Sequence, residues 1–478
     1  MTPEIFKYLL TFSYLALVLW LSFLGMRRTT DLASFAIGDK QFSPYLIGLT
    51  LSASIASTAT FVINPGFVYV HGLSAFLHFG IAASTGILAA FLVLTRGFLK
   101  FGESSKAVTI PQWIYHRYQS GELRLFFAFI NLLSIAFVVL ILFGCSLLVT
   151  GLFPIDQKLA LVLVMLFVFS YVLMGGTYAH AYTNALQGGM MLIIALYLFI
   201  DGLGLLGDGF FQSLANAGPQ FASVYNPESS LYYDFFSVFV SGFVVTFALM
   251  LQPHILTKVL YLREPSDVNK FIWTTVIVGF GFSLILMLGF YARFAGLEIE
   301  SQDQVVRDYL MFRFSDSLLG EYMLTFIFLT LLAAGMSTLD GILVSLSAMV
   351  INDIVVPATG RADMGLMLSR VFLIAMGLVG LALAWNPPAL VGIFAQKGVY
   401  GLAAASAAPI LIGVLSNRPI PAWVALLSAA TGLLTHLGLI LLFGVANPAV
   451  SATWAIFASF VVFGLGLSAH GLMKPAKA

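Results

Sequence analysis

The chain has 478 residues, of which 60% are hydrophobic and 9% are charged, and 22 Lys and Arg against 21 Asp and Glu leave a net charge of +1. A typical soluble domain carries roughly 25% charged residues, so this composition excludes a soluble globular protein and indicates a membrane protein. The balanced charge, without a long basic run, excludes a nucleic-acid partner. The lone Cys145 lies in an apolar run, so it forms neither an intrachain disulfide nor a CxxC site.

Apolar segments recur along the whole chain. The first is too long for the apolar core of a signal peptide and is stopped by Arg27 and Arg28, so we predict a membrane helix. Breaks at charged residues, prolines and glycines then divide the chain into thirteen predicted helices, which place the two ends on opposite sides of the bilayer. These helices lie near residues 5–26, 42–70, 73–99, 123–150, 159–174, 182–206, 234–256, 271–291, 321–356, 364–385, 390–415, 422–443 and 451–473.

The basic residues predict an orientation, because Lys and Arg concentrate in short cytoplasmic loops. With the N-terminus outside, 16 of the 22 basic residues, including Lys40, Lys474 and Lys477, fall on the cytoplasmic side. We therefore expect a multi-pass protein of the cell (inner) membrane, with the lipid bilayer around it, the N-terminus outside and the C-terminus cytoplasmic. The longest stretches between helices, about 207–233 and 295–320, are too short to be domains, so residues 1–478 form one membrane domain.

The second predicted helix has an unusual composition. Residues 51–60 are rich in small and hydroxyl side chains, and Asn64-Pro65-Gly66 follows. Proline and glycine loosen a helix, and non-helical backbone persists in a membrane only where it lines a cavity or meets a ligand. A small-residue packing face with a proline kink is the alternative interpretation.

The ninth predicted helix carries polar groups on one face. Ala334, Ser337 and Thr338 are spaced i, i+3 and i+4, so a carbonyl region and two hydroxyls lie together. Asp340 is more informative, because an acidic residue in mid-membrane costs at least roughly 2.5 to 3.5 kcal/mol on insertion scales and by default marks an ion or proton site. Alternatively, Asp340 lies nearer the inner interface and has a structural role.

Four segments together resemble one known family. Residues 333–341 (AAGMSTLDG) are similar to the eighth core helix of the sodium/solute symporters, which include sodium-coupled proline, pantothenate, monocarboxylate, sialic-acid and sugar transporters. The broken helix ending Asn64-Pro65-Gly66 and the segments 175–187 (GGTYAHAYTNALQ) and 251–258 (LQPHILTK) resemble the same family. The resemblance covers roughly residues 30 to 415.

The resemblance implies a leucine-transporter-type fold, which is an all-α polytopic membrane protein of about thirteen helices. Its two inverted five-helix repeats would span residues 42–206 and 234–415, joined by an outer loop at 207–233. A leading helix in 1–41 and two trailing helices in 416–478 would flank them. Substrate and ions would bind near the midplane, where the first helix of each repeat is broken.

The family's principal sodium site, carried over to this chain, implies sodium as the co-transported ion and no organic cofactor. Sodium needs several oxygens at short range, and neutral oxygens bind it weakly enough for release. The implied ligands are the backbone carbonyls of Ala53, Ala56 and Ala334 and the hydroxyls of Ser337 and Thr338.

The chain departs from the family at two positions. Many members have an Asp where this chain has Asn184, and a hydroxyl residue where it has Asp340. In members with an additional ion site these positions contribute to it. We therefore predict a second cation or proton site formed by Thr183, Asn184, Asp340 and Gly341, and the ion ratio stays open.

The expected partner besides sodium is a small-molecule substrate. No Lys or Arg is expected at mid-membrane depth, so an anionic substrate would rely on helix N-termini, backbone donors and the bound cation. The Gln-Pro-His run at 252–254 resembles the pantothenate, proline and monocarboxylate branches of the family, which implies a small nutrient with a carboxylate. The predicted substrate-binding residues are Ser54, Ser57, Thr58, Asn64, His78 and Phe247, although a lone histidine such as His78 is more often structural.

Other functional classes leave different patterns. An enzyme is not expected, because the seven histidines are scattered without an HExxH or comparable pair. A channel would need a continuous polar path. A substrate-sensing membrane module acting with a separate signalling partner, and proton-coupled rather than sodium-coupled symport, stay open as alternatives, as do the solute and the oligomeric state.

Overall fold

The structure is a computed structural model that describes residues 1–37, 42–207 and 209–473. Lys40, Lys474 and Lys477 of the orientation argument lie outside these residues, as do 38–41 of the predicted leading segment. Every regular element in the described ranges is a helix, as the composition predicts. The described α-helices of eight or more residues are α1 (Pro3–Met26), α3 (Pro44–Ile55), α4 (Asn64–His71), α6 (Ala83–Ser105), α7 (Ile110–Tyr118), α8 (Gly121–Ile130), α9 (Ile135–Leu152), α10 (Gln157–Asp201), α11 (Phe210–Ala217), α13 (Ser241–Leu249), α15 (Val268–Ser283), α16 (Met287–Phe294), α17 (Val305–Phe314), α18 (Leu318–Val350), α20 (Gly365–Ala384), α21 (Val391–Leu415), α22 (Ala422–Leu441) and α23 (Pro448–Met473).

Short elements connect and extend these helices. Among them are α2 (Leu32–Ile37), α5 (Leu73–Phe76), α12 (Pro219–Ala222), α14 (Pro253–Leu256) and α19 (Val356–Thr359), the π-helical segments η1 (Ala59–Ile63), η2 (Leu77–Ala82), η5 (Phe236–Val240) and η10 (Ile351–Val355), and the 3-10 segment η6 (Thr257–Tyr261). Local sequence explains several helix starts. Ser43 caps α3 by accepting a hydrogen bond from the Leu46 amide, and Pro44 occupies the first turn, where its missing N–H costs nothing.

Ten helical segments of the described chain are long and apolar enough to cross a membrane, or twelve if each of two bent pairs is one span. The sequence prediction was thirteen. The difference lies at α10, which counts as one span although it consists of two helices that meet at a kink, near the two helices predicted at 159–174 and 182–206. Gly176 interrupts the helical dihedrals there, with φ at 48° and ψ at −130°. A side chain at Gly176 would collide with Phe35, so both the dihedrals and the packing require glycine.

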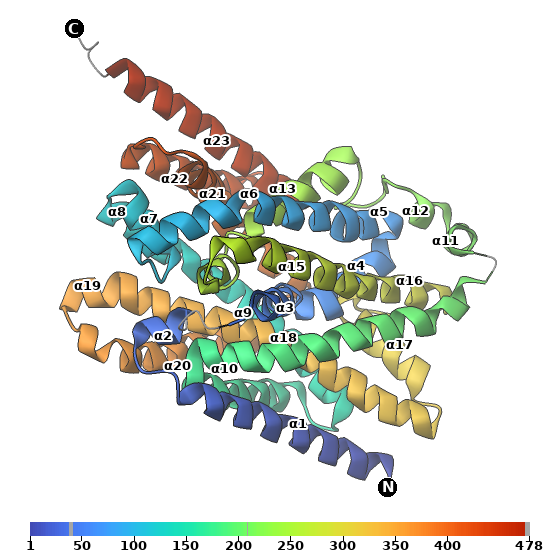
Figure 1. Cartoon of the computed structure of the whole chain (residues 1–478). Coiled ribbons are helices and arrows are strands. Elements are labelled where there is room, and N and C mark those ends of the chain that lie inside the picture. Colours follow the sequence, from blue (N-terminus) through green and yellow to red (C-terminus); the bar gives the residue numbers. More distant parts are fainter. Residues whose placement is uncertain (38–41, 208, 474–478) are drawn as a thin grey trace.

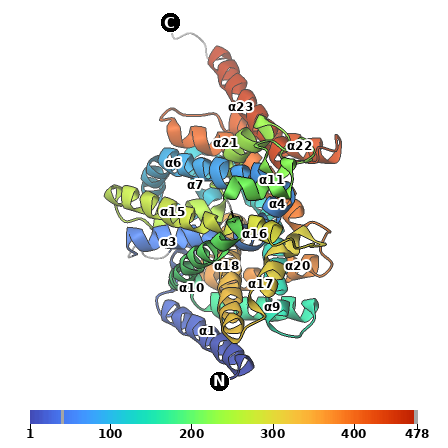
Figure 2. The same cartoon turned by 90° about the vertical axis from the view of Figure 1, so that its right-hand side faces the viewer.

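The helices run side by side, and α18 lies inside them (Figures 1 and 2). It packs against α1, α3, α9, α10 and α20, and its most apolar stretch is completely buried. The leading helix α1 covers α10 at one edge of the molecule, whereas α22 and α23 pack on α21 at the opposite edge (Figure 2). The interior around α18 is therefore the best shielded part of the chain.

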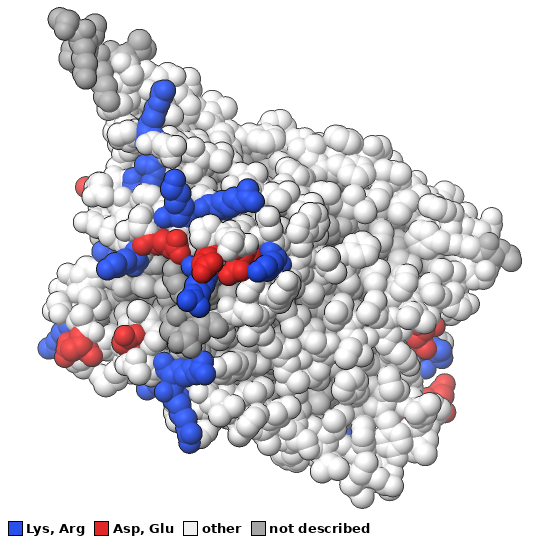
Figure 3. All heavy atoms as spheres, in the orientation of Figure 1, with Lys and Arg blue, Asp and Glu red and all other residues white. Residues whose placement is uncertain are grey.

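Charged side chains are distributed unevenly over the surface. On the face shown in Figure 3 they gather at the left end, with a small group at the right end and a broad uncharged band between. Helix α1 begins at the right end and α23 finishes at the left, so the start of the first helix and the end of the last lie on opposite sides (Figure 1). An uncharged band between two charged ends is the pattern that a bilayer requires of a protein crossing it.

Candidate functional site

Two helices are broken near the middle of the molecule. The first runs through α3 and η1–α4 with a bend of 54°, and the second runs through η5–α13 and α14–η6 with a bend of 67°. At the first break Ala56 has φ −83° and ψ 77°, so the helix stops there and its last carbonyls leave the regular hydrogen-bonding pattern. The structure therefore favours the broken-helix interpretation of residues 51–66 over a simple proline kink.

The polar face of α18 meets the first break. The Ser337 hydroxyl donates hydrogen bonds to the carbonyls of Ala53, at 2.9 Å, and Ala334, at 2.8 Å. The Thr338 hydroxyl donates to the carbonyl of Ser54 at 2.9 Å. All five residues are buried. Four of the five residues implied as sodium ligands thus lie at the contact between α3 and α18, and Ala56 lies one turn further along the broken helix.

This arrangement has the chemistry that a hard monovalent cation requires. Its oxygens are neutral, come from two helices and are buried, so a bound ion would exchange its water for carbonyl and hydroxyl oxygens without meeting a full negative charge. A bound cation would also be coordinated by the carbonyl oxygens that now accept hydrogen bonds from the two hydroxyls. Its binding would therefore tighten the contact between the broken helix and α18.

Asp340 lies deeper in the same helix contact. One carboxylate oxygen is 2.7 Å from Nδ1 of His180, and the other accepts a hydrogen bond from the Tyr171 hydroxyl at 3.1 Å. His180 and Tyr171 both belong to α10, on either side of Gly176. Asp340, His180 and Tyr171 are almost completely buried, so Asp340 is not hydrated, and its hydrogen bonds fit either an ion or proton site or a structural role.

The other members of the predicted second site surround His180. The side-chain amide of Asn184 donates to Ser54 Oγ and to the Ser337 carbonyl, both at 3.0 Å. Thr183 instead donates to the Ala179 and His180 carbonyls of its own helix. Gly341 faces the His180 ring, where a Cβ would come within 2.8 Å of Cε1. Asn184 and Asp340 therefore share one polar network, to which Thr183 and Gly341 contribute packing and backbone.

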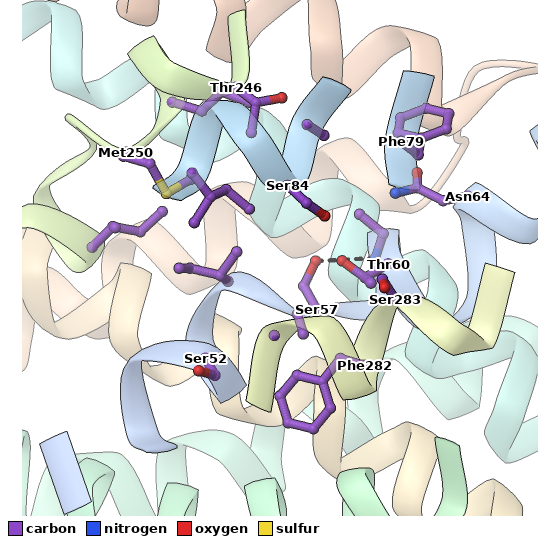
Figure 4. A pocket seen from close by; sticks show the side chains of 18 of the residues that line it. Ser52, Ser57, Thr60, Asn64, Phe79, Ser84, Thr246, Met250, Phe282 and Ser283 are labelled. Atoms are coloured by element: carbon purple, nitrogen blue, oxygen red, sulfur yellow. Dashed lines mark hydrogen bonds between the residues drawn. The ribbon is translucent and has the colours of Figure 1, made fainter. Parts of the chain in front are cut away.

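A cavity of about 330 Å³ opens beside the first break. This volume lies at the lower end of the range for small-molecule sites, roughly 300–1,000 Å³. The lining comes from both broken helices and from α6, α9, α15 and α21, and the described lining residues include no Lys, Arg, Asp or Glu. Figure 4 shows Ser57 and Ser84 pointing into the space, with Thr246 and Asn64 at its edges. The cavity also touches Ala56 and Thr338, so it adjoins the implied sodium ligands.

Three of the six predicted substrate residues line this cavity, namely Ser54, Ser57 and Asn64. Thr58, His78 and Phe247 do not belong to the lining. Thr58 is turned away from it and packs against Gly144 of α9 and Gly335 of α18.

The other two residues face protein rather than cavity. Nδ1 of His78 lies 3.1 and 3.0 Å from the carbonyls of Ser237 and Val238, so this ring joins η2 to η5. Phe247 is half-buried among apolar side chains between α13 and α6. Hydroxyl, histidine and aromatic residue types alone did not indicate which way these side chains point.

The sequence reasoning assigned no role to Lys258, His180 or Tyr171. Lys258 is 1% exposed, and its ammonium donates to the Thr50 carbonyl at 2.8 Å and to Ser54 Oγ at 2.6 Å. Lys258 is thus a fully buried basic residue, for which the sequence analysis assigned no site. An ionisable residue inside a largely apolar segment was the available signal, because burying one is costly without partners.

Comparison with known proteins agrees with this geometry. The family model described as the sodium:solute symporter family matches residues 35–432. A sodium/pantothenate symporter of Haemophilus influenzae is 24% identical over 395 residues, which cover 79% of each chain. A sodium/proline symporter of Staphylococcus aureus is 24% identical over 410 residues, which cover 80% of this chain and 75% of the relative.

Two solved structures share the fold. A sodium-coupled sialic acid symporter superimposes with a TM-score of 0.78 at 17% identity, covering 99% of both chains. A nucleobase-cation-symport-1 family transporter in a closed conformation gives a TM-score of 0.55 at 14% identity, covering 92% of this chain and 95% of the other. These proteins are membrane transporters and not enzymes. With the family model matching most of its length, this chain belongs to the sodium:solute symporter family.

Proposed function

We propose that this protein couples the inward movement of sodium to uptake of a small organic solute, with a carboxylate-bearing nutrient favoured, by alternating access. One observation carries the proposal: the Ser337 hydroxyl bonds to carbonyls of both α18 and the broken helix, and the next residue, Thr338, lines the cavity. An ion at this position would hold two elements together next to a bound solute.

Sodium would be coordinated by Ala53, Ala56 and Ala334 through their carbonyls and by Ser337 and Thr338 through their hydroxyls. These ligands come from α18, which is buried among its neighbours, and from a helix that is already bent. If the bent helix moves during transport, the ion binds one conformation better than the other. That difference in affinity is the coupling.

The cavity supports an uncharged or anionic solute. Its polar groups are mostly hydroxyls and side-chain amides, including Ser57, Asn64 and Gln252, and they can donate to carboxylate oxygens. Since the cavity touches Ala56 and Thr338, a carboxylate there would lie beside the sodium ion and gain from its charge. Pantothenate, proline and sialic acid, the solutes in the names of the relatives, all carry a carboxylate.

We propose the family's repeat arrangement for this chain, with repeats at 42–206 and 234–415 and thirteen crossings. Each repeat would begin with one of the two bent helices, and α10 would cross twice, turning at Gly176. The N-terminus would lie outside and the C-terminus in the cytoplasm, which puts the more heavily charged left end of Figure 3 on the cytoplasmic side. The polar network around Asp340 and Asn184, with Thr183 and Gly341 beside it, would be the second cation or proton site.

The experiment has two stages. A thermal-shift screen of amino acids, sugars and short carboxylates, with and without sodium, identifies a solute whose stabilisation depends on sodium. Uptake of that labelled solute into proteoliposomes is then driven by an imposed sodium gradient, with Ser337→Ala combined with Thr338→Ala as the test variant. Accumulation that the double variant abolishes supports the proposal. Accumulation driven only by a proton gradient would replace it with proton coupling, and sodium-dependent binding without accumulation would favour a sensing module.

A further inference from the structure

We propose that Lys258 supplies the second cation of this transporter from its own side chain, so that one sodium ion, and not two, binds per chain. The inference rests on the proposed sodium coupling and specifies its ion ratio. It assigns to Lys258 the position near Asn184 and Asp340 that a second mobile ion would otherwise occupy.

The surroundings of the Lys258 ammonium resemble those of a bound ion. It donates hydrogen bonds to two oxygens of α3, the Thr50 carbonyl at 2.8 Å and Ser54 Oγ at 2.6 Å. No carboxylate of the described residues makes an ion pair with it. A buried ammonium of this kind needs compensating charge, because removal from water disfavours it strongly.

Asp340 provides that charge through two intervening groups, the Ser54 hydroxyl and the His180 ring. Ser54 Oγ, which accepts from Lys258, lies 3.4 Å from Nε2 of His180, and Nδ1 of the same ring lies 2.7 Å from Asp340. The described interior around Ser54 thus contains one fixed cation and one carboxylate, joined by a hydroxyl and an imidazole. A neutral His180 can bridge them by accepting at one nitrogen and donating at the other.

Oδ1 of Asn184 is buried without a hydrogen-bond partner, whereas the other oxygens of this network already accept hydrogen bonds. Ser54 Oγ and the Ser337 carbonyl each accept from the Asn184 amide at 3.0 Å. The second oxygen of Asp340 accepts from the Tyr171 hydroxyl at 3.1 Å. A second sodium ion would have to displace these donors and would also meet the like charge of the ammonium, which disfavours its binding.

The position of Lys258 gives this arrangement a mechanical consequence. Lys258 lies on η6, beyond the bend of the second broken helix, whereas Thr50 and Ser54 lie on the inner half of the first. The ammonium therefore ties the two broken helices to each other and, through Ser54, to α10 and α18. A tethered charge stabilises the contact as a bound ion would, yet it is not released, so it adds nothing to the number of ions carried.

Sodium itself is the probe for this inference. Equilibrium binding of radioactive sodium to the purified protein in lipid nanodiscs counts the sites without knowledge of the solute. We expect about one saturable sodium site per chain for the wild type and for Lys258→Arg, which keeps the charge. Lys258→Met removes the charge at similar length, so the count should rise toward two with a Hill coefficient above one. Lys270→Met, which removes an exposed lysine of α15, is the matched control and should keep one site.

The outcomes separate this inference from the function on which it rests. Two sodium ions on the wild-type chain, or a single site in folded Lys258→Met, overturns the role of Lys258 and leaves sodium coupling intact. If the wild type shows no saturable sodium binding and Ser337→Ala does not change sodium binding, the proposed function is wrong instead. If Lys258→Met does not fold, Lys258→Gln replaces it. If neither variant folds, one sodium ion per wild-type chain supports the role of Lys258, and two sodium ions overturn it.

Discussion

The hydroxyl of Ser337 lies 2.9 Å from the carbonyl of Ala53, although 284 positions separate the two residues along the chain. The same hydroxyl donates to Ala334 in its own helix. Since Ala53 lies in the last turn of α3, just before the break, this contact joins a buried helix to the end of a broken one. Any movement of α3 must change the spacing of these oxygens.

Ser337→Ala should weaken sodium binding by about tenfold or more, because it removes a ligand oxygen and a hydrogen bond, and about 1.4 kcal/mol corresponds to a factor of ten. Ser347→Ala is the control, since Ser347 is a buried serine of the same helix that donates only to Val344. Sodium titration of thermal stability measures both variants. Equal sodium affinity in the two variants would contradict the proposed site.

Asp340→Asn should alter the sodium dependence or the pH dependence of uptake more than it alters folding. The substitution keeps the shape and an acceptor for Tyr171 but removes the only carboxylate of the described network around His180. We expect the thermal midpoint to fall by less than about 5 °C. Uptake is measured across pH at several sodium concentrations, with Asp201→Asn, which breaks a partly exposed pair with Arg313, as the control. Wild-type kinetics across pH in Asp340→Asn would show that the Asp340 carboxylate takes no part in ion or proton coupling.

Asn64 and His78 should respond in opposite ways. Asn64 lines the cavity, so Asn64→Ala should raise the solute concentration for half-maximal uptake by about fivefold to tenfold, with sodium affinity unchanged. His78 contacts the Ser237 and Val238 carbonyls instead, so His78→Gln should lower the thermal midpoint with little change in solute affinity. Solute titration and thermal denaturation of both variants provide the comparison. A large loss of solute affinity in His78→Gln alone would return His78 to the substrate site.

Asp303, which lies outside the membrane-spanning segments, should make the stability of the folded protein depend on pH. Burial raises the pKa of its carboxyl, and the hydrogen bond from the Val391 amide partly offsets this. Because the pKa is higher in the folded protein, the contribution of Asp303 to stability is fully present below about pH 3.9, the unfolded value, and is lost as the pH rises through the folded value. Asp303→Asn does not ionise, so its thermal midpoint relative to wild type should rise between about pH 4 and pH 8. A difference that stays constant with pH would contradict the burial of the charged form.

Much of the architecture follows from the sequence. The excess of apolar residues required a bilayer, the small-residue run before Asn64-Pro65-Gly66 indicated a broken helix, and the spacing of Ser337 and Thr338 placed two hydroxyls on one helix face. Resemblance then paired these two segments, and the structure brings them into contact. The connection predicted between residues 174 and 182 was too long, because hydropathy reports where apolar residues cluster and not that the two helices meet directly at a kink at Gly176.

Only the tertiary structure decided which ionisable groups meet. Lys258 and Thr50 are 208 positions apart, and His180 and Asp340 are 160 positions apart, so no local pattern could pair them. The direction of His78 and Thr58 was likewise set by the helices packed around them. Local sequence determines which segments are helical and which face is polar, because those depend on near neighbours. The partner of a buried charge depends on how distant helices pack, and that is fixed only when the whole chain has folded.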